Sequence, residues 1–159
     1  NHDPKQVKIL IVDDDNLNIT VLKHYLSRLQ LVNVESAKTG AEAVSKYIKE
    51  IENGGRFDLI TMDLNMPIMD GKEACRQIRA YEAEKGVRPC MIVVISGDCT
   101  QSETNACLHP EGLIKANGFL RKPVLFNDFS NLLNIILSRY LNELANYPRI
   151  SAALPLKNK

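Results

Sequence analysis

The fold of this chain is decided by the stretch Met62-Asp63-Leu64-Asn65-Met66-Pro67-Ile68-Met69-Asp70-Gly71. It places Asp63 at the end of an apolar run and directly before a turn. A second apolar run, residues 7–12, has the same build and ends in Asp13, Asp14 and Asp15. If both runs are buried parallel strands, their carboxyl ends bring these acids to one edge of a sheet, where like charges repel unless a cation lies among them. A hard divalent ion such as Mg²⁺ prefers such oxygen ligands.

Apolar runs alternate with segments of helical periodicity along the whole chain, which is typical of an α/β fold. We expect strands at residues 7–12, 33–37, 57–62, 91–95 and 119–121. We expect helices at 17–29, 40–52 and 72–84, a short helix within 98–115, and a long last helix with apolar residues from 129 to 144. The run at 91–95 is apolar almost throughout, which indicates burial on both faces, as in a parallel sheet.

The first predicted helix illustrates how its faces are assigned. Its apolar residues recur at helical spacing and predict a buried stripe made of Leu17, Val21, Tyr25, Leu26 and Leu29. Asn16 is placed to cap or enter this helix, and Asp15 fits a capping or first-turn acid better than a metal ligand. Asp70 is expected to cap the third helix in the same way.

The composition limits the class of protein. The chain has 159 residues, of which 45% are hydrophobic, so we expect one folded domain at 7–146, a flank at 1–6 and a tail at 147–159. Lys and Arg number 20 against 19 Asp and Glu, which argues against direct binding of nucleic acid. No run reaches the roughly 18 apolar residues that span a bilayer, and the first residues do not resemble a signal peptide.

These features predict a soluble, cytoplasmic domain. Because the chain does not begin with Met, we expect it to be either a piece of a longer protein or a processed form. The four cysteines form no C-x-x-C pair, so we expect reduced thiols, with Cys99 the best candidate for an exposed one. A zinc site at Cys107 and His109 is disfavoured because recognisable ligand spacing is missing.

Several short motifs lie at the ends of successive predicted strands, and their order resembles the receiver (response-regulator) domain of two-component phosphorelays. The motifs are Asp13-Asp14, Asp63, Met66-Pro67, Asp70-Gly71, Ser96 and Lys122-Pro123. The resemblance covers about residues 7–140 and is greatest to the receiver domains of hybrid histidine kinases. It implies a flavodoxin-like, doubly wound five-stranded parallel sheet in the order 2-1-3-4-5, with helices on both faces.

The resemblance also implies roles for individual residues. Asp63 would accept a phosphoryl group from a histidine of a partner, which is either a histidine kinase or a histidine phosphotransfer protein. Lys122 would pair with the acidic cluster, and the Ser96 hydroxyl would bind the phosphoryl group. The expected cofactor is Mg²⁺ (or Mn²⁺), with ligands from the side chains of Asp14 and Asp63 and the backbone carbonyl of Asn65, and with Asp13 reaching the metal directly or through water.

Further positions are expected to switch or to shape the backbone. Ser96 and Phe119 resemble the pair that moves together when the aspartate is phosphorylated. Pro67 and Gly71 would form the turn behind Asp63, and the Lys122-Pro123 bond is predicted to be cis. Asn65 and Asp98 flank the expected site and are candidates to set the lifetime of the phosphorylated form. Gly97 departs from the family, which often has Ala there, and the segments around 46–56 and between Ser96 and Lys122 are longer than usual.

Two alternatives to a working receiver stay open. The first is a degenerate receiver that serves only as a protein-interaction module. A small aspartyl-phosphate phosphatase also uses strand-end aspartates, but that class normally has a second aspartate two residues after its nucleophile, where Asn65 stands. As a receiver the domain would be a signalling module that catalyses only its own phosphoryl transfer and dephosphorylation. It could be a separate regulator or the cytoplasmic part of a membrane-anchored hybrid kinase, and its oligomeric state is open.

Overall fold

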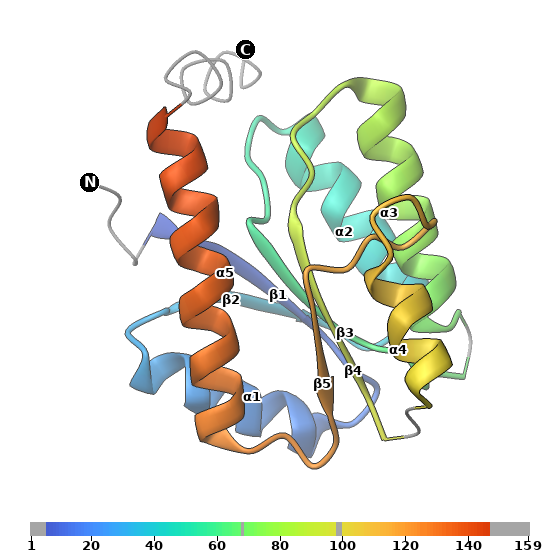
Figure 1. The fold of residues 1–159 in the computed structure, drawn as a ribbon. Coiled ribbons are helices and arrows are strands. Elements are labelled where there is room, and N and C mark those ends of the chain that lie inside the picture. Colours follow the sequence, from blue (N-terminus) through green and yellow to red (C-terminus); the bar gives the residue numbers. More distant parts are fainter. Residues whose placement is uncertain (1–5, 68, 98–99, 147–159) are drawn as a thin grey trace.

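The structure is a computed structural model that describes residues 6–67, 69–97 and 100–146. Strands and helices alternate along the chain (Figure 1). The strands are β1 (Lys8–Val12), β2 (Asn33–Ala37), β3 (Leu59–Asp63), β4 (Met91–Ser96) and β5 (Gly118–Arg121). The helices are α1 (Asn16–Arg28), α2 (Gly40–Glu52), α3 (Gly71–Lys85), α4 (Gln101–Leu108) and α5 (Phe126–Asn146).

The sheet has five strands in the order β2-β1-β3-β4-β5, and every neighbouring pair is parallel. This confirms the doubly wound topology predicted from the sequence. Val12 pairs with Met62 and Asp63 pairs with Ile95, so β1, β3 and β4 end nearly level. Their carboxyl ends therefore form one edge of the sheet at the point where the strand order reverses, which is where α/β sheets bind ligands.

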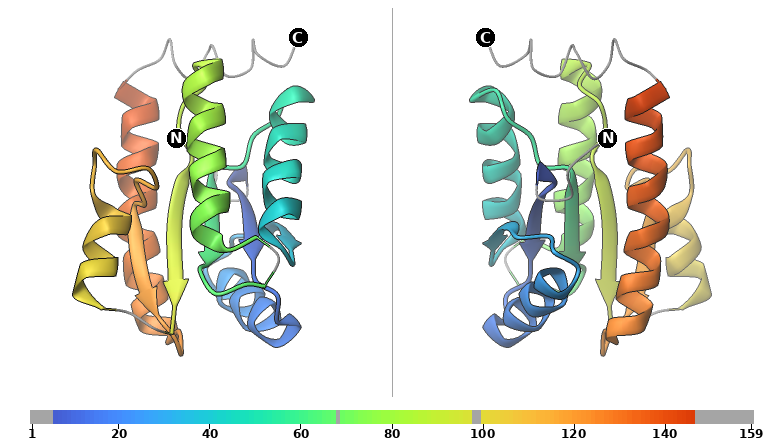
Figure 2. Two further views of the ribbon diagram at one scale, coloured as in Figure 1. Left: turned by 90° about the vertical axis from the view of Figure 1, so that its right-hand side faces the viewer. Right: turned by 90° about the vertical axis from the view of Figure 1, so that its left-hand side faces the viewer.

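Helices cover both faces of the sheet (Figure 2). One apolar core lies under α2, α3 and α4 and includes the buried residues Ala43, Val44, Tyr47, Ile60, Met62, Ala74, Ile78, Ile92, Val94 and Cys107. The other lies under α1 and α5 and includes Ile9, Ile11, Leu22, Leu26, Leu59, Val93, Phe129, Leu133 and Tyr140. Because both faces are buried, the central strands are apolar over most of their length.

The buried face of α1 differs from the predicted stripe. Leu17 and Val21 are exposed, at 69% and 36%, and the helix buries Ile19, Leu22 and Leu26 instead. The expectation for Leu17 and Val21 was wrong because apolar residues occur on both sides of this helix, and spacing alone does not say which side meets the sheet. Two apolar side chains are thus left on the surface close to the end of β1.

The helix starts were largely predictable. Asp15 caps α1 by accepting from the Leu17 N–H, and Asp70 caps α3 by accepting from the Glu73 N–H. Asn16 is therefore the first helical residue rather than the cap. The last helix begins at Phe126, three residues before its first fully buried residue, Phe129. Between these two aromatic residues lie the polar Asn127 and Asp128, which interrupt the apolar pattern at the start of the helix.

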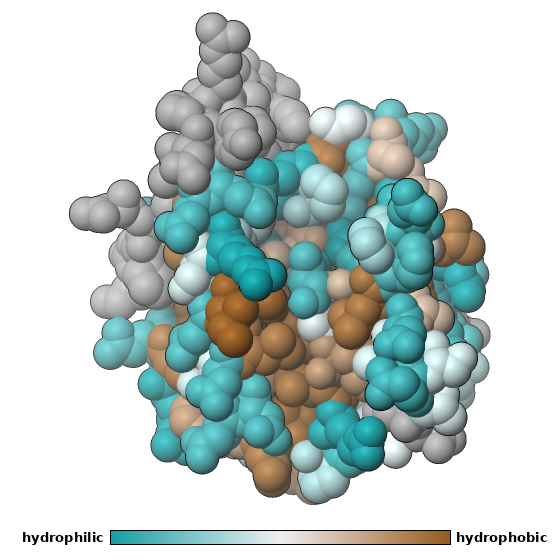
Figure 3. All heavy atoms as spheres, viewed as in Figure 1, coloured by the Kyte–Doolittle hydropathy of each residue, from teal (hydrophilic) through white to brown (hydrophobic). Residues whose placement is uncertain are grey.

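The face seen in Figure 3 is hollowed between α5 and α4, and apolar side chains gather there over β5. The exposed large apolar residues of this part of the chain are Leu108, Leu113, Leu125 and Ile135. Among the described residues, no helix is both long and apolar enough to cross a bilayer. Predictions that concern Asp98, Cys99 and the tail at 147–159 lie outside the described residues.

Candidate functional site

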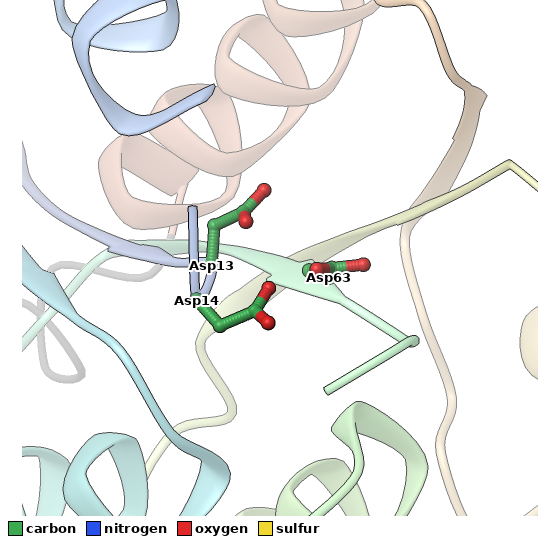
Figure 4. Close-up of side chains that lie close together, drawn as sticks. All are labelled: Asp13, Asp14 and Asp63. Carbon is green, nitrogen blue, oxygen red and sulfur yellow. The ribbon is translucent and has the colours of Figure 1, made fainter. Parts of the chain in front are cut away.

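Three carboxylates meet at the carboxyl edge of the sheet. Asp13 and Asp14 directly follow β1, and Asp63 is the last residue of β3. One oxygen from each lies within 4.8 Å of the others, and Figure 4 shows the three side chains gathered between the ends of the two strands. Within the described part of the chain, this is the group of His, Cys, Asp and Glu side chains whose geometry suits a metal ion, and it includes neither Cys107 nor His109.

Short turns orient two of these carboxylates. Asp13 and Asp63 are buried, with 3% and 1% of their surfaces exposed, whereas Asp14 is exposed. The Asp15 N–H donates to Asp13 Oδ1 at 2.9 Å, and the Asn65 N–H donates to Asp63 Oδ1 at 3.0 Å. In both turns the chain folds back onto the carboxylate two residues earlier, which aims each acid at the end of its strand.

Lys122 brings a positive charge to the cluster. Its Nζ lies 3.0 Å from Asp63 Oδ1 and 3.9 Å from Asp13 Oδ2. A single ammonium cannot balance three carboxylates, and buried charge that is not balanced is costly. The site therefore keeps a net negative charge that a divalent cation would neutralise.

The second oxygen of Asp63 completes this picture. Asp63 Oδ2 is buried, and no side chain or backbone group of the described residues gives it a hydrogen bond. Buried polar atoms in folded proteins are almost always paired, so an orphaned carboxylate oxygen is a candidate ligand atom. Carboxylate donors, excess negative charge and a free oxygen fit Mg²⁺, which takes few protein ligands and keeps several waters.

The electrostatic strain of the cluster shows in Asp13. Burial raises the pKa of the Asp13 carboxyl above its usual value, and the nearby charge of Asp63 acts in the same direction. The hydrogen bond from the Asp15 N–H and the charge of Lys122 act in the opposite direction but do not cancel the increase in this pKa. The folded domain therefore holds the ionised form of Asp13 at a cost.

Ser96 and Asn65 lie on the β4 side of Asp63. Ser96 is fully buried at the end of β4, and its Oγ lies 3.4 Å from Asn65 Nδ2. Phe119, on β5, is half-buried and packs against the core under α2, α3 and α4. The hydroxyl and the aromatic ring thus lie on neighbouring strands, with the hydroxyl beside the turn that follows Asp63.

The turn behind Asp63 depends on close backbone contact. A Cβ added to Gly71 would lie 2.2 Å from the carbonyl oxygen of Asp63, so only glycine lets α3 begin directly behind the aspartate. Pro67 is exposed within this turn. The Lys122-Pro123 bond is cis, which is the isomer expected from the sequence.

Two features of the site region were not predictable from motifs. The Tyr25 hydroxyl, on α1, donates to the carbonyl oxygen of Val124, two residues beyond Lys122. The apolar periodicity of α1 marked Tyr25 as a core residue but carried no signal for its hydroxyl. Leu17 and Val21 expose apolar surface on the same helix, whose first residue is two positions after Asp14.

Comparisons with known proteins identify the family of this chain. The chain matches the response regulator receiver domain over residues 9–136. It is 38% identical over 121 residues to hybrid signal transduction histidine kinase E of Dictyostelium discoideum, covering 76% of this chain and 7% of the relative. It is 31% identical over 137 residues to the osmosensing histidine protein kinase SLN1 of Saccharomyces cerevisiae, covering 84% and 10%. The chain thus spans a small part of these curated relatives.

Solved structures of receiver domains have a similar fold. The receiver domain of the Saccharomyces cerevisiae response regulator Ssk1, co-crystallised with the histidine phosphotransfer protein Ypd1, matches with a TM-score of 0.67 and 30% identity over 78% of this chain and 83% of that one. The receiver domain of the histidine kinase CKI1 from Arabidopsis thaliana, complexed with Mg²⁺, matches with a TM-score of 0.69 and 30% identity over 84% and 96%.

Proposed function

This chain belongs to the response regulator receiver domain family, and we propose that Asp63 is its phosphoacceptor in a histidine-to-aspartate phosphorelay. The observation that carries the proposal is the Asp63 carboxylate: one oxygen is paired with Lys122, and the other is buried without a partner among the described residues. A carboxylate held in this way has a free oxygen with which to attack, and its neighbours are suited to balance an incoming phosphoryl group.

The transfer step follows from this arrangement. A carboxylate oxygen of Asp63 attacks the phosphorus of a phosphohistidine, the phosphorus–nitrogen bond breaks, and the imidazole leaves with the electron pair and then takes up a proton. Lys122, already 3.0 Å from Asp63, would offset negative charge on the phosphoryl oxygens as they arrive. The Ser96 hydroxyl would donate a hydrogen bond to one of these oxygens once the phosphoryl group is in place.

The acidic cluster would hold the metal ion. Asp13, Asp14 and Asp63 would supply side-chain oxygens, and Asn65 its backbone carbonyl, to Mg²⁺ or Mn²⁺. When bound, the ion supplies charge neutralisation that lets an anionic nucleophile meet an anionic phosphoryl donor. Asp13 and Asp63 are already oriented for this by the turns that bond their Oδ1 atoms.

Phosphorylation would act on the rest of the domain through Ser96 and Phe119. Movement of the Ser96 hydroxyl toward the phosphoryl group would vacate space beside β5. The half-buried side chain of Phe119 would be able to fill this space. The face that would change is the one formed by α4, β5 and α5, where apolar side chains reach the surface (Figure 3).

The phosphodonor is proposed to be a histidine phosphotransfer protein or the histidine-bearing domain of a kinase. The similar Ssk1 receiver was crystallised with such a protein, Ypd1. On this chain the exposed apolar residues Leu17 and Val21 offer a docking surface on α1, near the acidic cluster. We place the domain in the cytoplasm, where a kinase that uses ATP would phosphorylate the donor, and we propose that it catalyses only its own phosphorylation and dephosphorylation.

The test is the intact mass of the protein after incubation with acetyl phosphate, with and without Mg²⁺. We expect the wild type to gain one acid-labile phosphoryl group only when Mg²⁺ is present, and Asp63→Asn to gain none. The matched control is Asp70→Asn, which alters another acid of the same loop whose role is to cap α3. That variant should be phosphorylated like the wild type.

Two results would count against the proposal. A wild type that gains no mass from acetyl phosphate, or from a phosphorylated histidine phosphotransfer protein, would indicate a degenerate receiver that serves only as an interaction module. An Asp63→Asn variant that is phosphorylated as fully as the wild type would place the acceptor elsewhere.

A further inference from the structure

Lys122 lies beyond the regular part of the sheet. The last pair in the β4–β5 ladder is Ser96 with Arg121, so Lys122 begins the connection to α5. Its backbone N–H donates to the carbonyl oxygen of Ser96 at 2.9 Å, which holds the start of this connection. The lysine side chain is a flexible four-carbon stem. The position of its ammonium therefore depends on how firmly residues 122–125 are held.

Tyr25 holds the other end of the same connection. Its hydroxyl donates to the carbonyl oxygen of Val124 at 2.9 Å, across 99 positions of sequence. Its ring packs edge-on against Phe126 at 5.3 Å and against Phe129 at 5.7 Å, the first aromatic residues of α5. Arg28, one turn further along α1, lies 3.7 Å over the Phe126 ring. The third and fourth turns of α1 thus contact and hold the chain just after Lys122.

The other end of α1 begins at the acidic cluster. Asp13 and Asp14 precede its cap, Asp15, whose backbone N–H bonds Asp13. From Asp15 to Tyr25 the helix rises about 15 Å as a rigid rod. Helix α1 therefore contacts the carboxylate cluster at its cap, Asp15, and the segment after Lys122 at its third turn.

We propose that Tyr25 is a positioning residue for Lys122, acting through the Val124 carbonyl, and that α1 thereby sets the spacing between the ammonium and the carboxylates. This inference rests on the proposed phosphoacceptor function, in which Lys122 must meet the phosphoryl oxygens. Transfer of a phosphoryl group depends almost wholly on positioning and charge, so a small displacement of the lysine lowers its rate.

A purely structural role would need only the Tyr25 ring, because an apolar ring fills the space between α1 and α5 without a hydroxyl. The chain offers a matched control in Tyr140, on α5 in the same layer. Its hydroxyl also donates a hydrogen bond, to Asp58 Oδ1 at 2.6 Å, but Asp58 directly precedes β3 and lies at the opposite edge of the sheet from Asp63. Tyr25→Phe and Tyr140→Phe each remove one hydroxyl and one hydrogen bond.

The experiment measures the rate of phosphorylation by acetyl phosphate at saturating Mg²⁺, followed by intact mass, together with the thermal midpoint. We expect Tyr25→Phe to be phosphorylated about 3- to 10-fold more slowly than the wild type. Tyr140→Phe should keep the wild-type rate within about twofold, although both substitutions lower the thermal midpoint by a similar few degrees.

A double-mutant cycle identifies the route of the effect. Lys122→Ala alone should slow phosphorylation by roughly 10²- to 10³-fold. If Tyr25 acts through Lys122, adding Tyr25→Phe to Lys122→Ala should change the remaining rate by less than about twofold.

Several results would overturn the inference. They are a wild-type rate in Tyr25→Phe, an equal slowing in Tyr140→Phe, or an undiminished effect of Tyr25→Phe in the Lys122→Ala background. Each of these can occur while the wild type is phosphorylated normally, which leaves the proposed function intact. A wild type that takes up no phosphoryl group would instead contradict the proposed function and remove the premise of this inference with it.

Discussion

Among the described residues, buried charge gathers in two clusters, which differ in how completely their polar atoms are paired. Under α3, Arg79 and Glu82 form an ion pair at 2.9 Å, with 9% and 2% of their surfaces exposed. Glu82 also accepts from the Tyr47 hydroxyl and the Cys90 N–H, and Arg79 donates to the carbonyl oxygens of Cys90, Ile114 and Lys115. At the carboxyl edge of the sheet, Asp63 Oδ2 meets no donor from the described residues, and burial raises the pKa of the Asp13 carboxyl.

This difference in pairing indicates that the Arg79–Glu82 cluster has a structural role and that the acidic cluster has a functional one. A buried ion pair whose partners are all provided by the fold stabilises one arrangement of the chain and leaves nothing for a ligand to bind. Arg79 in this way fixes residues 114–117, part of the long connection between α4 and β5. We propose that the acid cluster, which keeps an unpaired oxygen among the described residues, is instead completed from outside, by a cation and a phosphoryl group.

The largest effect on stability should come from breaking the Arg79–Glu82 cluster, whose polar atoms are all paired. Arg79→Met would leave the Glu82 charge buried without its cation and should lower the free energy of unfolding by about 3–5 kcal/mol, measured by urea denaturation. Arg76→Met is the matched control, because Arg76 lies on the same helix in an exposed pair with Glu73. That substitution should cost less than about 1 kcal/mol. Equal losses in the two variants would show that the buried network does not hold the fold.

A smaller effect should follow from crowding the backbone at the open site. Gly71→Ala would put a methyl group against the Asp63 carbonyl and should cost about 1–3 kcal/mol while slowing phosphorylation of Asp63. Gly97→Ala is the control, because its Cβ would lie 3.8 Å from that of Lys122, in ordinary contact. It should change stability by less than about 0.5 kcal/mol. The explanation fails if the two alanine variants unfold at the same urea concentration and are phosphorylated equally fast.

Metal binding should stabilise the folded domain only when the acidic cluster is intact. At Mg²⁺ tenfold above its dissociation constant, the wild type should gain about 1.4 kcal/mol, seen as a rise in thermal midpoint of about 2–5 °C. Asp63→Asn and Asp13→Asn should lose most of this gain, whereas Arg76→Met should keep it. The same gain in all of the variants would show that the ion binds elsewhere.

The smallest effect concerns Asp13 in the absence of metal. Its folded-state pKa is raised above 3.8, so the folded domain holds the Asp13 proton more tightly than the unfolded chain does. This contribution to stability is present at low pH and is lost as the pH rises from 3.8 through the raised pKa. With EDTA at neutral pH, Asp13→Asn should therefore be more stable than the wild type, by about 1 kcal/mol or less.

Thermal midpoints of the wild type and Asp13→Asn between pH 4 and 8 would test this sign. The difference in favour of the variant should grow as the pH rises and should disappear or reverse when Mg²⁺ is added. A variant that is less stable than the wild type at every pH without metal would contradict the account.

The fold and the acidic cluster were predictable because both follow from short stretches of sequence. Each central strand is a short apolar run, and Asp13, Asp63 and Ser96 each stand at or directly after the end of one. Parallel pairing then brings the ends together whatever the details of packing. The expectation of a receiver domain with a 2-1-3-4-5 sheet is confirmed by the topology and by the family match.

What escaped prediction depends on contacts between distant elements. Arg79 and Glu82 are three residues apart on α3 and look like a solvated surface pair until Tyr47 and residues 114–117 close over them. Leu17 and Val21 fit a core stripe as well as Leu22 and Leu26 do, and only the position of α1 on the sheet decides between them. The hydrogen bond of the Tyr25 hydroxyl is likewise set by the path of the chain after β5.

We propose above all that Asp63, whose Oδ2 has no partner among the described residues, receives the phosphoryl group. The most direct measurement is to treat the protein with acetyl phosphate and Mg²⁺, reduce the product with borohydride, which converts an aspartyl phosphate to homoserine, and locate homoserine by peptide mass spectrometry. We predict homoserine at position 63 and at neither 13 nor 14. Homoserine at another aspartate, or none in a protein that has gained a phosphoryl group, would contradict the assignment of Asp63.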